Sequence, residues 1–368
     1  MARKYRMMRC RSCGFPRVVN LFIKWNSNGT ITQMMRKDYR VVILPHGFID
    51  NLFSQIDSRL GLPIEHIAFE AQRNASKAVF QAFYDRIPVT KYLVKPGFMK
   101  RIGVEQFNKV AVITGQCNSK TIEYVPGKYG IARMKNPFHI DLMAANVVGA
   151  FETLEGIPFS HTWKEEPDGS YIIRVDATGE KPEIAKRMEL EFGKILPGNR
   201  VLKRCNRCSA PLGVSHLKWL EDDGVILDTK AGSRVIFLDA YMVSTVLREL
   251  TKELGEVIDE IVVEAQRDWA VEHIKQLGLV GHEVPPSEED FRRKFVDYLE
   301  LIPLYGWGNP VSISASSERS QVVIENPYER HILAGTFKGL RDALLRSKSK
   351  VEFKEDRPGV ISYTIEEA

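Results

Sequence analysis

The sequence has no apolar run approaching the length of about 18 residues that a membrane-spanning helix requires. Its basic beginning, MARKYRMMRCRSCG, is not followed by an apolar segment, so it lacks the pattern of a secretory signal peptide. Cysteine is scarce, with five among 368 residues, and four of the five form close pairs. That usage suits a metal or redox site in a reducing compartment better than a disulfide framework. We therefore expect a cytoplasmic protein without a membrane span.

The signatures of familiar enzyme classes are also missing. The sequence has no Gly-rich phosphate loop of the Walker or Rossmann type, no His-Glu-x-x-His motif and no Gly-x-Ser-x-Gly motif. It has no cluster of carboxylates at metal-binding spacing, and no nucleophile stands out. These absences favour a binding protein over an enzyme.

Positive charge is concentrated at one end of the chain. The net charge is only +5, but the first forty residues carry ten Lys or Arg against a single acidic residue, Asp38. Clustered positive charge can bind nucleic acid by neutralising phosphates. A solvated terminus whose cations stabilise nearby thiolates is the simpler interpretation. Hydrophobic residues at 44% and charged residues at 27% are typical of a globular protein, and the length favours two domains.

What the sequence does contain is an internal repeat. Cys10 and Cys13 in CRSC match Cys205 and Cys208 in CNRC, 195 residues later. Further matches follow in the same order: Trp25 with Trp219, Arg40 with Arg234, Glu70-Ala71-Gln72-Arg73 with Glu264-Ala265-Gln266-Arg267, and Asn136-Pro137 with Asn326-Pro327. Such self-similarity predicts a tandem duplication. We assign a first copy to residues 1–178, a linker to 179–201 and a second copy to 202–368.

Both copies have the same predicted plan. A Cys-x-x-Cys turn leads into a strand pair around the Trp and an Asn-Gly or Asp-Gly dipeptide, which is a strong hairpin signal, and a third strand follows. Helices are predicted next, over 47–86 with a break near 61–63, and over 240–277. Two strands, a helix and two strands complete each copy, at 110–114, 130–134, 143–154, 159–166 and 170–175, and at 311–315, 321–325, 333–345, 350–355 and 360–365. The linker is expected to be helical over 183–195. This mixed order predicts the α+β class.

The four paired cysteines are the strongest candidate site. A Cys-x-x-Cys turn can place two thiolates on one tetrahedral ion, and structural zinc takes four ligands. Because each copy supplies two, we predict that Cys10, Cys13, Cys205 and Cys208 converge on one Zn²⁺ that joins the copies. Thioredoxin-like redox pairs, or small buried side chains without a complete site, are the alternatives. Cys117 has no partner nearby in the sequence and is expected to be an incidental loop thiol.

The second copy resembles the 4-vinyl reductase domain family, also called predicted hydrocarbon-binding domains. The residues that carry this resemblance are Gly306-Trp307-Gly308, Asn326-Pro327, Gly335, Gly339 and the closing strand pair, with residues 247–268 similar to the family's leading helices. The first copy, with its insertion around 114–130, matches less well and is the one expected to have diverged. The resemblance implies a compact α+β fold akin to vesicle-transport-particle subunits, a cavity for a small apolar molecule, and a regulatory or sensory role. Family members commonly carry cysteines in the final strand pair, and this chain has none there.

Candidate ligand contacts follow from this resemblance and from local sequence. Trp307 is flanked by glycines that would let its ring stand free, and Tyr328, His331 and Phe337 lie in the same region. His139 lies near the start of the corresponding predicted helix of the first copy. We expect a regulatory or accessory protein that binds a small apolar molecule and is stabilised by one zinc ion. The alternatives are a zinc-ribbon regulator that binds nucleic acid and a redox-active accessory factor.

Overall fold

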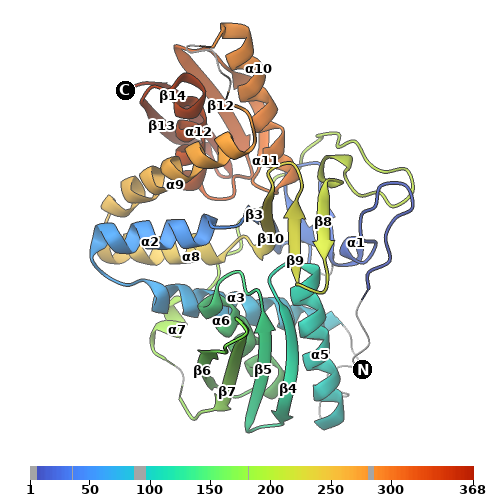
Figure 1. The fold of residues 1–368 in the computed structure, drawn as a ribbon. Coiled ribbons are helices and arrows are strands. Elements are labelled where there is room, and N and C mark those ends of the chain that lie inside the picture. Colours follow the sequence, from blue (N-terminus) through green and yellow to red (C-terminus); the bar gives the residue numbers. More distant parts are fainter. Residues whose placement is uncertain (1–5, 35, 87–96, 181, 281–285) are drawn as a thin grey trace.

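A computed structural model describes residues 6–34, 36–86, 97–180, 182–280 and 286–368. A central sheet lies between two lobes, each of which combines a four-stranded antiparallel sheet with helices (Figure 1). The predicted α+β class is therefore confirmed. Among the described residues, no helix is long and apolar enough to cross a membrane.

The central sheet takes its strands from both ends of the chain. Its order is β1-β2-β3-β10-β9-β8, and all neighbours are antiparallel. These strands are β1 (Ile23–Trp25), β2 (Ile31–Gln33), β3 (Arg40–Pro45), β8 (Leu217–Leu220), β9 (Val225–Asp228) and β10 (Ser233–Asp239). The register between β3 and β10 runs from Val41 opposite Asp239 to Pro45 opposite Val235. The strand blocks that follow the two Cys-x-x-Cys turns thus form one sheet, beside the short helices α1 (Val19–Phe22) and η1 (Leu212–Val214).

The two lobes have the same strand order. In the first lobe the order is β4-β5-β7-β6, and in the second it is β11-β12-β14-β13. The first lobe consists of α3 (Glu65–Arg86), α5 (Gly97–Ile113), β4 (Asn118–Val125), β5 (Tyr129–Lys135), α6 (Ile140–Glu155), β6 (Phe159–Glu165) and β7 (Tyr171–Ala177). The second consists of α9 (Val257–Gln276), α10 (Glu288–Leu299), α11 (Leu301–Leu304), β11 (Asn309–Ser314), β12 (Arg319–Glu325), α12 (Arg330–Leu345), β13 (Ser349–Arg357) and β14 (Val360–Glu367).

Glycines permit the closest helix contacts in both lobes. Helix α3 packs on α6, and α9 packs on α12. A Cβ atom at Gly149 would lie 2.5 Å from the backbone oxygen of Arg73, and one at Gly339 would lie 2.6 Å from that of Arg267. These two glycines match in the sequence because any larger side chain would force the helices apart.

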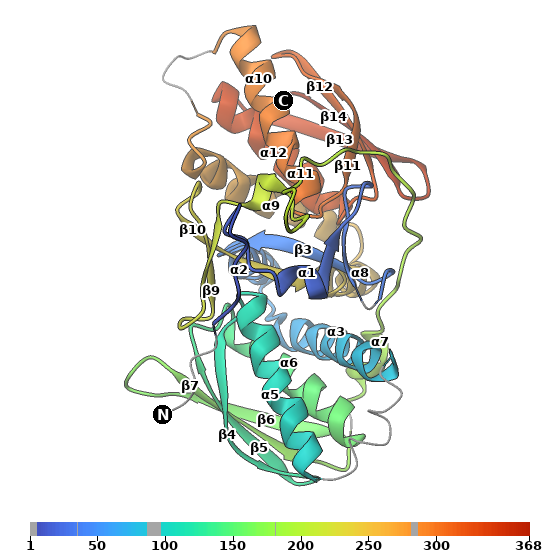
Figure 2. The same cartoon turned by 90° about the vertical axis from the view of Figure 1, so that its right-hand side faces the viewer.

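Each Cys-x-x-Cys block docks on the lobe formed by the other half of the chain. Helix α2 (Phe48–Leu60) packs on α9, and α8 (Met242–Leu254) packs on α3. The indole Nε1 of Trp25 donates to the backbone oxygen of Leu304 at 2.9 Å, and that of Trp219 donates to Ile113 at 2.8 Å. Figure 2 shows the sheet and these helices between the lobes. The domain boundaries at 178 and 202 stay a prediction. Helix packing and the tryptophan hydrogen bonds both join residues on opposite sides of these boundaries.

The matching arginines hold these docked segments in place. Arg40 donates to the backbone oxygens of Gly306, Asn326 and Pro327, at 2.9 to 3.2 Å. Arg234 makes the equivalent contacts to the first lobe, including the oxygen of Gly115 at 2.7 Å. Burial lowers the pKa of both guanidinium groups. Their recurrence in the sequence is explained by this structural role.

Two predicted elements are wrong. Residues 110–114 were expected to form a strand, but they end helix α5, and the strand begins at Asn118. The side chains of Ala111, Val112 and Ile113 are buried, so packing overrides the β preference of Val and Ile. The linker helix expected over 183–195 is limited to α7 (Ile184–Arg187). It ends where the side-chain Nδ2 of Asn74 donates to the backbone oxygens of Ala185 and Met188, both at 2.8 Å.

Candidate functional site: a four-thiol cluster and an apolar cavity

Both Cys-x-x-Cys motifs form tight turns with the same hydrogen bonds. The backbone N–H of Cys10 donates to the oxygen of Phe15 at 2.8 Å, and that of Cys205 donates to Ala210 at 2.9 Å. Gly14 and Ser209, which follow the second cysteine of each motif, adopt positive φ values of 73° and 61°. Such a turn brings both thiols of a motif to one side of the loop.

The four thiols come together, as the sequence predicts. The Sγ atoms of Cys10 and Cys205 are 3.8 Å apart, and those of Cys13 and Cys208 are 3.5 Å apart. All four sulfur atoms lie within 4.8 Å of one another. A tetrahedral ion with Zn–S bonds of about 2.3 Å requires S–S distances of roughly 3.8 Å. The cluster therefore has the size and the donor set of a structural zinc site. Cys117 lies outside the cluster, buried in the loop between α5 and β4.

Backbone dipoles favour the thiolate form at two positions of the cluster. The N–H groups of Cys13 and Ser12 lower the pKa of Cys10, and those of Arg207 and Cys208 lower the pKa of Cys205 to about 6. Burial raises the pKa of Cys208 to about 12. A bound divalent cation outweighs these differences, because cysteine ligands are deprotonated when they bind metal.

An aromatic layer supports the cluster. The ring of Phe15 makes edge contacts with Trp25 and Trp219, at centroid distances of 5.9 and 5.2 Å. Both tryptophans are buried and belong to the core. Arg9 donates to the backbone oxygen of Trp219 at 2.8 Å, and Arg204 donates to that of Trp25 at 2.7 Å. Each turn is thereby tied to the strand that follows the other turn.

Several of the clustered N-terminal cations have partners within the protein. Arg9 pairs with Glu221 at 3.0 Å, Arg36 pairs with Asp38 at 3.1 Å, and Arg40 is buried among backbone oxygens. These charges are not free to contact phosphates. Nucleic-acid binding through the basic N-terminus stays a prediction without support from these contacts.

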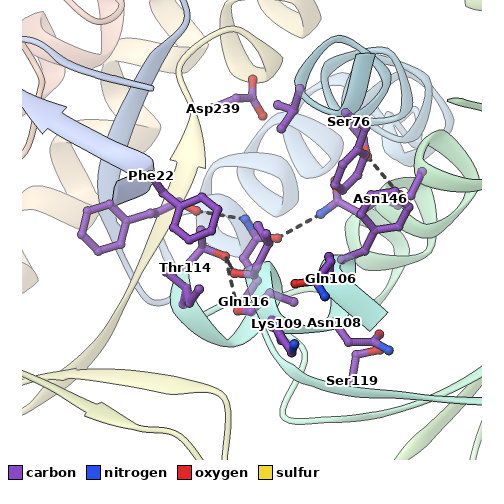
Figure 3. Close-up of a pocket in the computed structure, with 18 of the residues that line it drawn as sticks. Phe22, Ser76, Gln106, Asn108, Lys109, Thr114, Gln116, Ser119, Asn146 and Asp239 are labelled. Carbon is purple, nitrogen blue, oxygen red and sulfur yellow. Dashed lines mark hydrogen bonds between the residues drawn. The ribbon is translucent and has the colours of Figure 1, made fainter. Parts of the chain in front are cut away.

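A cavity of about 470 Å³ lies in the first lobe, beneath the central sheet (Figure 3). Helices α3, α5 and α6 and strands β4 and β5 form most of its wall, and residues 18–23 and strand β10 close it. Most lining side chains are apolar, among them Phe22, Val104, Met134, Val147 and Phe151. Leu21, which also lines it, is 71% exposed, so the cavity reaches the surface beside α1. Its volume lies in the usual range for small-molecule sites.

Three of the polar side chains that line the cavity are joined to one another. The side chains of Gln72, Asn146 and Gln116 form a hydrogen-bonded chain that ends on the backbone oxygen of Phe237. Asp239 also lines the cavity. Its Oδ1 accepts the N–H groups of Tyr241 and Met242, at 3.0 and 2.8 Å, where helix α8 begins. Burial raises the pKa of this carboxyl group.

The corresponding space in the second lobe is nearly filled. A cavity of about 10 Å³ remains there, lined by Pro45, His273, Tyr298, Leu301, Ile302, Tyr305 and Trp307. Trp307 and Gln116 each stand two residues before the Asn that begins the first strand of their lobe. They make the same contact, since the indole Nε1 of Trp307 donates to the oxygen of Ile43 at 2.9 Å and Nε2 of Gln116 donates to that of Phe237 at 2.9 Å. Aromatic side chains in the second lobe occupy the volume that the first lobe leaves open.

The predicted ligand contacts lie outside the larger cavity. Trp307, Tyr328, His331 and Phe337 are buried in the second lobe, and of these only Trp307 touches the small cavity. His331 lies between Glu329 and Asp259, at 3.2 and 3.3 Å. Nε2 of His139 is 3.9 Å from Oδ1 of Asp50. Their role as ligand contacts stays a prediction. The residues that line the first-lobe cavity were not identified from the sequence. The alignment of the two copies does contain a signal, because Gln116 stands where the second copy has the larger Trp307.

The arginine of the repeated Glu-Ala-Gln-Arg motif has a structural role. Arg73 bonds to Glu70 on its own helix at 3.0 Å and also pairs with Glu152 on α6. Arg267 instead pairs with Asp342 on α12, at 2.7 Å. The arginine therefore joins two helices in each lobe, and in the first lobe it also forms an intrahelical pair with Glu70.

The buried His273 makes stability depend on pH. Burial lowers its pKa from 6.5 to about 4, so the unfolded chain takes up a proton more readily than the folded one. Its stability contribution is therefore intact above pH 6.5 and is lost as the pH falls from 6.5 towards 4. Between pH 7 and pH 5 we expect a loss of about 2 kcal/mol in the free energy of unfolding, measured by urea denaturation. His273→Phe, which keeps the stacking on Trp269, should reduce this loss, and the exposed-site control His66→Gln should not. Equal losses in all three proteins would contradict the prediction.

No protein-family model and no curated protein matches this chain. Among solved structures, it is similar to the phenol-responsive sensory domain of the transcription activator PoxR, with 14% identity and a TM-score of 0.32 over 41% of this chain and 85% of that one. It is also similar to a mutant H-NOX from T. tengcongensis, with 12% identity and a TM-score of 0.26 over 34% and 72%. TM-scores of this size do not establish a shared fold, so the resemblance to 4-vinyl reductase domains stays a prediction.

Proposed function

We propose that this protein binds a small, mainly apolar molecule in the first-lobe cavity and that one structural Zn²⁺ on Cys10, Cys13, Cys205 and Cys208 holds the two Cys-x-x-Cys blocks together. The observation that carries the proposal is the contrast between the lobes. A similar framework surrounds about 470 Å³ in the first lobe and about 10 Å³ in the second. The open space is therefore a property of particular side chains and not of the fold.

The energetic cost of such a space supports a ligand. The cavity reaches the surface beside Leu21, so water fills it when no ligand is bound, and its mostly apolar side chains then stay in contact with water. Burial of apolar surface contributes about 25 cal/mol per Å². An apolar molecule that enters beside Leu21 removes this unfavourable contact with water.

The zinc ion would hold part of the cavity wall in place as well as stabilise the core. The first turn ends at Gly14, and the chain then runs into a segment of which Val18, Val19, Leu21, Phe22 and Ile23 line the cavity. A metal that fixes Cys10 and Cys13 would fix this wall too. The proposal includes a regulatory or accessory role, membership of the hydrocarbon-binding type of domain, and a reducing, cytoplasmic compartment in which the thiols stay available for metal.

Native mass spectrometry of protein purified without chelators tests the proposal. We expect one zinc ion and one organic adduct per chain, with the adduct removed by extraction into organic solvent. The extracted protein should then bind an apolar probe, 2-naphthol, at about one molecule per chain in calorimetry. Protein that carries no adduct and shows no saturable binding of the probe would contradict the binding function.

A further inference from the structure

The amide chain in the cavity has only one possible arrangement of its oxygen and nitrogen atoms. The backbone oxygen of Phe237 can only accept, so Gln116 must present Nε2 to it, at 2.9 Å. Oε1 of Gln116 then accepts from Nδ2 of Asn146 at 3.1 Å. Oδ1 of Asn146 accepts from Nε2 of Gln72 at 2.8 Å. The first contact therefore decides every amide orientation that follows, which resolves the usual ambiguity of amide flips.

The hydrogen-bonded series of amides ends at Oε1 of Gln72, which has no partner among the described residues. Gln72 lines the cavity and is only 3% exposed, and its Oε1 is buried with no hydrogen-bond partner among the described residues. A buried acceptor without a partner costs about 1–3 kcal/mol. Rotating the amide of Gln72 would not help, because its oxygen would then face the oxygen of Asn146. Water that enters the cavity, or a hydroxyl or N–H group of a bound molecule, would supply the missing donor.

Charge at this end of the cavity restricts that molecule further. Asp239 lines the cavity and is 8% exposed, so an anionic ligand would meet a buried carboxyl group. Lys109 is the lining cation, but it is exposed, and Figure 3 shows it well apart from Asp239. At the end of the cavity near Asp239, the described lining residues thus supply hydrogen-bonding groups and no cation.

We infer that the cavity takes an uncharged molecule that is apolar over most of its surface and carries one hydroxyl or N–H group, which donates to Oε1 of Gln72. This inference rests on the proposed binding function and specifies the chemistry of its ligand.

The second lobe supplies a matched control position. Gln266, which corresponds to Gln72, donates through Nε2 to Oγ1 of Thr336 at 3.0 Å, and that hydroxyl donates to the backbone oxygen of Ile332 at 2.7 Å. Replacing either glutamine by Met keeps the length of the side chain and removes its polar atoms. Only the change at Gln72 removes the proposed acceptor.

Calorimetric titration with probes of nearly the same shape tests the inference. On the extracted wild-type protein, 2-naphthol should bind roughly tenfold or more tightly than 2-methoxynaphthalene, which cannot donate, and than the anion 2-naphthoate. Gln72→Met should reduce this preference for 2-naphthol over the ether to about twofold or less. Gln266→Met should retain the wild-type preference.

The outcomes separate this inference from the function on which it rests. Equal binding of 2-naphthol and 2-methoxynaphthalene, or tighter binding of 2-naphthoate, would overturn the inference and leave the binding function standing. A preference that survives in Gln72→Met would also overturn it, because the donor would then meet another group. Failure of all three probes to bind would overturn both.

Discussion

Replacing Cys205 by Ser should abolish metal binding by the whole chain, with zinc falling from about one ion per chain to background in elemental analysis. Cys10 and Cys205 belong to different turns, yet their sulfur atoms are 3.8 Å apart, so either substitution removes a ligand of the same tetrahedral site. Cys10→Ser should therefore give the same loss. Because binding energy at a structural zinc site is also folding energy, the free energy of unfolding should fall by several kcal/mol, on the order of magnitude of the lost binding energy, and the thermal midpoint should fall with it in both variants.

Cys117→Ala is the control for this experiment. Cys117 is buried and burial raises its pKa to about 12, but it lies outside the cluster, so the variant should keep one zinc ion. Two ions per chain, or retention of half the metal in Cys205→Ser, would contradict a shared site. Metal-free protein with a disulfide that forms and reduces reversibly would instead favour the redox alternative.

Transferring the filling residues of the second lobe to the first should close the cavity and weaken binding of 2-naphthol at least a hundredfold. The variant combines Val104→Phe, Gln116→Trp and Asn146→Thr, after Phe295, Trp307 and Thr336 at the corresponding positions. The new Trp can donate to the oxygen of Phe237 as Trp307 donates to that of Ile43, and the new Thr can accept from Gln72 as Thr336 accepts from Gln266. The substitution set thus preserves hydrogen bonding while it removes volume.

Stability measurements show whether the loss of binding has the proposed cause. The filled variant without ligand should be at least as stable as the ligand-free wild type, because filling a cavity adds contacts. The reverse change in the second lobe, Trp307→Gln, should lower the free energy of unfolding by about 3–5 kcal/mol and leave probe binding in the first lobe intact. Undiminished binding by the filled variant would place the ligand elsewhere.

Much of the secondary structure could be predicted because periodicity and turn residues act locally. The break between α2 and α3 falls at Gly61, and the strands around Trp25 and Trp219 form as expected. Residues 110–114 were assigned wrongly because the apolar run VAVIT suits a buried helix end as well as a strand. Helix α10, with the side chain of Ser287 capping its start, was not predicted, although the cap is a readable signal.

The sequence by itself determined which side chains form the thiol cluster, since two Cys-x-x-Cys turns are incomplete zinc sites and four thiols make one. It also determined the α+β class. Only the tertiary structure decided that each strand block docks on the opposite lobe, because pairing of β3 with β10 depends on contacts nearly 200 residues apart. It also decided where the cavity lies. Gln116 borders a large cavity and Trp307 a small one. This difference depends on where each side chain points and on the volumes of the side chains packed around it, which the sequence pattern does not give.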